Sequence, residues 1–174
     1  MHMDTLAFLK DFASYTEWAD ALVFSAIRGG GEAERDGKIL VLVRHIVLVQ
    51  NAFLSVLRRR PFASDETRSL DMAALEEYAR NVHRDAVQYH EELDSGMFER
   101  IVELPWQGLV GEKLGFEVRS PKLGEALVQV FVHTAYHRGQ VNMRLREIGI
   151  DPPMTDYIAW VWAGKPSATW HSER

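Results

Sequence analysis

His133 and His137 stand four residues apart in a segment whose apolar residues recur at helical intervals. On an α-helix, residues with this spacing are neighbours on one face, with Cβ atoms about 5–6 Å apart, so that both imidazoles reach one point. The spacing fits a single divalent metal ion that takes two nitrogen ligands from one helix. The apolar residues of the same stripe predict that both histidines face inward; these residues are Leu123, Leu127, Val130, Val141 and Leu145. A buried histidine pair needs a partner, which is a metal ion, a carboxylate or a water network.

The elements that must position this pair are helices. Apolar residues at steps of three and four predict four long amphipathic helices, over residues 4–28, 38–60, 71–93 and 120–148. Asp4 or Thr5 is expected to cap the first helix, Pro61 to stop the second, and Ser120 to cap the fourth. Four such helices with little strand predict an all-α fold, a four-helix bundle.

The connections carry further predictions. Residues 32–37 are polar and predict a loop, whereas residues 98–118 are rich in β-prone residues broken by proline and glycine, which predicts a long, hairpin-like connection before the fourth helix. A short apolar helix or turn is expected over residues 154–162, followed by a loose end from Lys165. The connections are long enough for crossovers between the helices.

Composition bounds the class of protein. The 174 residues are 47% hydrophobic and 26% charged, which predicts one globular domain spanning residues 1–174. The net charge of −5 gives no support for nucleic-acid binding. The first ten residues do not resemble a signal peptide, and no uncharged run has the length of a membrane span, so we expect a cytoplasmic protein. There is no cysteine, so any metal must be held by imidazole and oxygen.

The string from His133 to Gln140, HTAYHRGQ, resembles the signature of the DinB (DNA-damage-inducible) superfamily of four-helix-bundle metalloproteins. Three other matches support the likeness: Tyr15 with Trp18-Ala19-Asp20 and Leu22, His45-Ile46 with Gln50, and Pro152-Pro153 with Asp156-Tyr157. The resemblance implies a divalent metal held by His45, His133 and His137. It also implies an up-down-down-up order of helices and a homodimer. Some relatives are transferases or isomerases that use a low-molecular-weight thiol, and many have no established activity.

The residues themselves support the same chemistry. A histidine pair one turn apart leaves half of a coordination sphere empty, and His45 alone among the other histidines lies on a strongly apolar helix. Three neutral imidazoles leave a position for water or substrate, as in a catalytic rather than a structural site. Zinc and nickel fit best, and iron or manganese also fits. The alternative is that these histidines are core residues with satisfied hydrogen bonds.

Several other side chains have two interpretations each. Arg138 and Gln140 are candidates for residues that support the metal ligands; Arg138 alternatively binds an anion or pairs with Glu17 or Asp20. Tyr136 is expected to serve as packing, and Gly139 to mark a close approach of helices. Four of the five tryptophans line a substrate pocket or fill the core or an interface; they are Trp18, Trp106, Trp160 and Trp162. His83 and His90, on a heavily charged helix, are expected at the surface, and residues 58–60, three arginines, at a solvated helix end.

Two functional hypotheses follow, and they leave open whether the protein is an enzyme. The first is a metal-dependent thiol transferase or hydrolase-type enzyme, in which water or a thiol co-substrate occupies the open position and a small molecule is the substrate. The second is a non-catalytic, stress-associated metal-binding bundle. Direct DNA binding is a weaker idea, because the protein is acidic.

Overall fold

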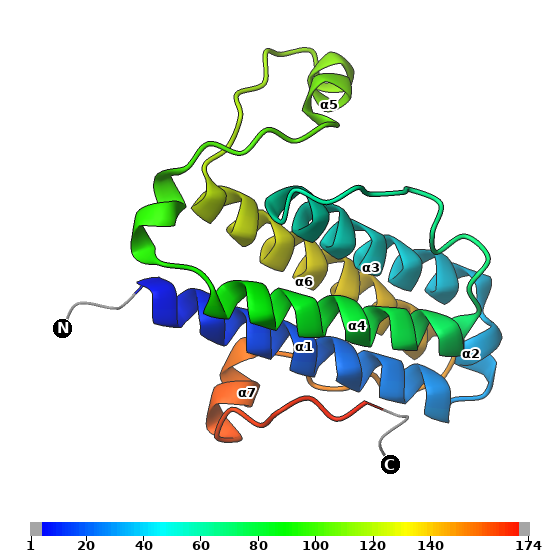
Figure 1. Cartoon of the computed structure of the whole chain (residues 1–174). Helices are drawn as coiled ribbons and strands as arrows, with labels where there is room; N and C mark the ends of the chain where they lie inside the picture. Colours follow the sequence, from blue (N-terminus) through cyan, green and yellow to red (C-terminus); the bar gives the residue numbers. More distant parts are fainter. Residues whose placement is uncertain (1–4, 171–174) are drawn as a thin grey trace.

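Four long helices pack side by side in the computed structural model of the protein, which describes residues 5–170 (Figure 1). They are α1 (Thr5–Gly29), α3 (Gly37–Leu57), α4 (Met72–Glu91) and α6 (Leu123–Glu147). Shorter elements connect or follow them: α2 (Glu32–Arg35), the 3-10 helix η1 (Ser95–Glu99), α5 (Gln107–Leu114) and α7 (Tyr157–Trp162). The predicted all-α bundle is confirmed, and no strand is found within the described range. Asp4, one of the two predicted caps of the first helix, lies outside it.

The order of the four helices is up-down-down-up. In Figure 1, α3 and α4 run in one direction and α1 and α6 in the other. Neighbouring helices around the bundle are α1 with α4, α4 with α3, α3 with α6, and α6 with α1. Because α3 and α4 are parallel, residues 58–71 must return along the whole length of the bundle, as Figure 1 shows.

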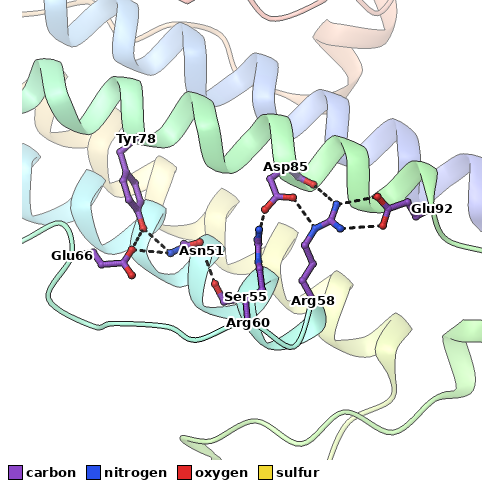
Figure 2. A network of polar contacts seen from close by, with 8 residues as sticks. All are labelled: Asn51, Ser55, Arg58, Arg60, Glu66, Tyr78, Asp85 and Glu92. Atoms are coloured by element: carbon purple, nitrogen blue, oxygen red, sulfur yellow. Dashed lines mark hydrogen bonds and ion pairs between the residues drawn. The ribbon is translucent and has the colours of Figure 1, made fainter.

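Polar side chains hold the parallel pair α3 and α4 together (Figure 2). Arg58, at the end of α3, forms ion pairs with Asp85 at 2.7 Å and with Glu92 at 3.0 Å. Arg60 also pairs with Asp85. The arginine run was expected to be a solvated helix end, but two of its three members bind acidic groups of the next helix. Farther along the pair, Tyr78 donates a 2.6 Å hydrogen bond to Glu66 on the returning connection.

Short side-chain caps fix where the helices begin. The carboxylate of Asp36 accepts hydrogen bonds from the backbone N–H groups of Lys38 and Ile39, and so starts α3. Asp36 also pairs with Arg144 of α6 at 2.7 Å, which ties the start of α3 to the end of α6. The predicted loop over residues 32–37 is wrong in part, because it contains the one-turn helix α2.

The connection before α6 is not a hairpin. Its β-prone residues have no partner strand, and an isolated hairpin is at best marginally stable. Residues 107–114 form α5 instead, which Gly115 ends in the left-handed conformation with a φ of 76°. The remaining strand-like contact is an isolated bridge between Ile101 and Lys122. It closes the base of residues 101–122, which we call the excursion. Lys122, the bridge partner, is extended, so α6 begins at Leu123 with Lys122 as its N-cap residue rather than with the predicted Ser120.

Residues after α7 run back along α1 (Figure 1). The predicted short helix is present as α7, and Trp160 within it is buried against Tyr15 and Ala19 of α1. The expectation of a loose end from Lys165 is wrong. Trp170 is only 2% exposed, and its ring lies 5.8 Å from that of Phe24 and 5.7 Å from that of His83.

Helix α3 has the length and apolarity of a membrane span, judged by composition alone. Half of its most apolar window is buried inside the bundle, where it packs against α4 and α6. A core helix of a soluble protein has the same character, so the fold is consistent with a soluble protein. The cytoplasmic location stays a prediction.

Candidate metal centre

Three histidines from two helices converge on one point. His45 lies on α3, and His133 and His137 lie one turn apart on α6, the helix that packs against it. Each offers a ring nitrogen that lies within 4.8 Å of the other two. The Nε2 atoms of His45 and His133 are 3.2 Å apart. The structure therefore brings together the histidines that the sequence singled out.

This spacing suits a shared metal ion. Two nitrogen ligands held about 2.0–2.1 Å from a tetrahedral ion lie about 3.3 Å from each other. The observed 3.2 Å between the Nε2 atoms of His45 and His133 is close to that value. The donors are three imidazoles without a carboxylate or thiolate, so a four-coordinate ion held here would keep one position for an exchangeable ligand.

The sequence predicted that the histidines face the core, and this prediction is wrong: they lie at the edge of the α3–α6 interface. His45 is exposed, and His133 and His137 are half-buried. The reason is rotational: the core positions of α6 are Thr134 and Arg138, and each histidine stands one residue earlier, about 100° around the helix. The site therefore opens toward solvent.

The environment keeps two of these imidazoles, those of His45 and His133, neutral. Burial lowers the pKa of His133 to about 4, with smaller contributions from His137 and His45. Burial, followed by the charge of His137, also lowers the pKa of His45. A metal ion binds the neutral imidazole, so the protonation state at neutral pH is the one that coordination requires.

Gln140 orients one of the three rings. Its Oε1 lies 2.7 Å from Nδ1 of His137, one turn earlier on α6. An amide oxygen only accepts, so Nδ1 carries the proton and donates, which leaves the Nε2 lone pair of His137 free for a ligand bond. The Nδ1 atom of His133 is buried and has no hydrogen-bond partner among residues 5–170.

Arg138 lies in a buried polar network behind the histidines. Its guanidinium donates to Asp20 at 2.9 Å and to the hydroxyl of Tyr15 at 2.9 Å, so the predicted pairing with a carboxylate is confirmed. Gln50 donates to the other oxygen of Asp20 at 2.8 Å, and His83 lies 3.1 Å from the same oxygen. Together these residues connect α1, α3, α4 and α6 through one carboxylate.

Asp20 remains ionised in this network. Burial by itself raises the pKa of Asp20, but the hydrogen bond from His83 and the charge of Arg138 outweigh burial, and the pKa lies below its ordinary value. His83 was expected at the surface and is 4% exposed. Sequence reasoning missed this role because the charged residues Arg84 and Asp85 directly follow His83, while its partner lies 63 residues away.

Three further expectations for this region are corrected or settled by burial. Tyr136 is 66% exposed, and its ring lies at the surface, edge to face with that of His137 at 5.0 Å. A Cβ placed on Gly139 would meet no atom within 4 Å, so that glycine does not mark a close helix approach. His90 is buried rather than exposed, and its Nδ1 lies 2.7 Å from the carbonyl of Ala86.

The tryptophans divide between core, cavity wall and surface. Trp160 is a core residue, and Trp162 is 79% exposed. Trp18 packs beside the small core cluster that contains Trp160. Trp106 lines a cavity that His133 also lines.

Comparison with known proteins gives one family match. A model described as the DinB family matches residues 31–168, which is well over half of the chain. The matched range contains all three histidines and begins after α1. A search of curated proteins finds no match.

Proposed function

Since this chain belongs to the DinB family, we propose that it binds one divalent metal ion through His45, His133 and His137 and serves as a metal-dependent enzyme of the transferase or hydrolase type. The observation that carries the proposal is the convergence of three imidazoles at an open edge of the bundle. A closed structural site would have a fourth protein ligand.

The chemistry that the metal supplies is a lowered pKa for a water molecule or a thiol that occupies the remaining position. The chain has no cysteine, so a thiol would come from a low-molecular-weight co-substrate. The protein's part is to hold three rings in fixed orientations. Gln140 does so for His137, and the pairing of Arg138 with Asp20 holds α6 against α1. All-nitrogen donors favour zinc or nickel, and iron or manganese also fits.

The experiment that tests this proposal combines metal analysis with a spectroscopic titration. Freshly purified protein is expected to contain close to one divalent metal ion per chain. In the cobalt-substituted protein, a low-molecular-weight thiol is expected to change the visible absorption spectrum, because the open position accepts an exchangeable ligand. A metal-loaded protein whose cobalt spectrum ignores thiols would instead support the second function, a non-catalytic stress-associated metal-binding bundle.

Gln140 provides a test of ligand orientation. Replacing Gln140 with leucine removes the acceptor for Nδ1 of His137, and loss of such a partner typically lowers metal affinity by about 10–100-fold. We expect at least about a tenfold weaker affinity by competition with a chromophoric chelator. Met143→Ala, on an exposed position of the same helix, is the control and should keep the wild-type affinity. Equal affinities for both variants would remove Gln140 from the site.

A homodimer is part of the proposal. Three exposed side chains one turn apart on α6 support it, because monomers seldom leave such a stripe uncovered; they are Val128, Val132 and Tyr136, at 49%, 60% and 66% exposure.

A further inference from the structure

A cavity of about 650 Å³ opens beside the histidines. One wall is α3, the opposite wall is the first half of α6, and the outer wall is the excursion that carries α5. Pockets that bury small molecules have volumes of about 300–1,000 Å³. The cavity therefore has the size of a small-molecule site.

The cavity begins next to the metal centre. His133 is part of its lining. Two other lining residues lie one turn from a histidine: Val49 follows His45 by four residues on α3, and Gln129 precedes His133 by four on α6. One turn is about 5.4 Å of helix, so the cavity extends from the histidines toward α5.

The lining is chiefly apolar. Phe53 and Trp106 meet edge to face with ring centroids 5.1 Å apart, and aliphatic side chains complete the walls; among these are Leu48, Val49, Leu104, Val110 and Val118. The charged residues of the lining, Arg119 and Glu125, are exposed and of opposite sign. A ligand in this cavity would gain most of its binding free energy by burying apolar surface, since the charged residues of the lining are exposed.

Close packing and hydrogen bonds hold the outer wall together. Gly111 of α5 packs so closely on the returning chain that a Cβ there would lie 3.0 Å from Val118 and 3.1 Å from the carbonyl of Phe116. Gln107 donates a 3.0 Å hydrogen bond to Ser120, which joins the start of α5 to the start of the α6 segment. Two backbone hydrogen bonds of 2.8 Å close the base: Val102 N–H donates to the carbonyl of Pro121, and Leu123 N–H to that of Arg100.

We propose that this cavity binds the uncharged aromatic or branched aliphatic body of a small-molecule substrate, with the reactive end of the molecule beside His133. His133 is part of the cavity lining and therefore marks that end of the cavity. The reactive role rests on the proposed function, whereas the binding of an apolar body depends on the cavity alone.

The binding test uses N-phenyl-1-naphthylamine, an uncharged probe that fluoresces in apolar sites. Val110→Trp fills the cavity from α5, at a position exposed enough to accept a larger side chain, and Leu109→Trp places the same ring on the neighbouring residue, which is 72% exposed and outside the lining. We expect Val110→Trp to weaken probe binding at least tenfold and Leu109→Trp to leave it within twofold. Val49→Trp, from the opposite wall, should repeat the loss. Equal binding by Val110→Trp and Leu109→Trp would overturn the proposal.

A second measurement separates the cavity from the metal. The His137→Ala variant should bind the probe within twofold of wild type, whatever happens to its metal content. In cobalt-substituted protein, naphthalen-2-ylmethanethiol should change the cobalt spectrum at a concentration at least tenfold lower than 2-mercaptoethanol does, and Val110→Trp should remove that advantage. If the protein binds no metal but Val110→Trp still abolishes probe binding, the proposed function fails and the apolar site stands. If both thiols act equally on wild type, the assignment of the substrate class fails while metal binding stands.

Discussion

Replacing His137 with alanine is expected to lower metal affinity by more than about 100-fold, which exceeds the 10–100-fold effect typical of losing a group that only orients a ligand. The reason is that two imidazoles on separate helices, His45 and His133, cannot hold the ion as three do. Metal analysis after dialysis against a weak chelator measures the effect.

Two controls accompany this variant. Met143→Ala shortens an exposed side chain of the same helix, and His83→Gln removes a histidine that bonds to Asp20 instead of joining the cluster. Both variants should keep wild-type metal content. If His83→Gln kept its fold but bound no metal, the assignment of the third metal ligand to α3 would be wrong.

Asp20→Asn is expected to destabilise the fold by about 3–5 kcal/mol, the typical result of removing one partner of a buried ion pair. The substitution leaves the Arg138 guanidinium, which is 3% exposed, without a counter-charge. It also disturbs the bonds from Gln50 and His83. Urea denaturation followed by circular dichroism gives the free energy of unfolding.

A control and a double variant identify the cause. Asp11→Asn removes a carboxylate that pairs with Lys165 at the surface and should change stability by no more than about 1 kcal/mol. Asp20→Asn combined with Arg138→Met should be more stable than Asp20→Asn alone, because it removes the stranded charge. If the double variant were as unstable as the single one, the loss of packing and hydrogen bonds, and not the unpaired charge of Arg138, would be the cause of the destabilisation.

The same carboxylate predicts a pH dependence. The pKa of Asp20 is lower in the folded protein than its ordinary value of about 3.9. In acid the unfolded chain therefore binds the proton first, and the stability that Asp20 contributes is present above about pH 4 and is lost as pH falls through the lower folded pKa. Asp20→Asn should show a shallower loss of stability across that acidic range.

The helices and the pairing of two histidines in the cluster were predictable because both depend on local spacing. Apolar steps of three and four identified all four long helices, and the separation of His133 and His137 by one turn placed both rings at one point. The third histidine required the family pattern, since nothing local to His45 says which helix α3 faces. The predicted direction of the histidine side chains was wrong by one residue, about 100° around the helix. The periodicity of apolar residues does not define the buried face of a helix that closely.

The buried network was beyond local reasoning. Asp20 has its partners on three other helices, so its environment exists only once the bundle is assembled. Likewise, His83 stands beside Arg84 and Asp85, and that charged context predicts a surface position. Asp85 is itself engaged, because Arg58 and Arg60 reach it from α3. The excursion was misread as a hairpin because β-propensity reports side-chain shape and not the presence of a partner strand.

Trp170 has a consequence for the integrity of the charged centre. Its ring lies 5.7 Å from that of His83, which in turn bonds to Asp20, so the indole helps to shield this partner of the carboxylate from water. Proteolytic removal of Trp170 would expose His83 to water. The local dielectric constant would then rise, and the attraction between Asp20 and Arg138 would weaken. The C-terminal segment, which the sequence suggests is dispensable, thus covers part of the core. A shortened version of this protein keeps that cover only if the cut falls after Trp170.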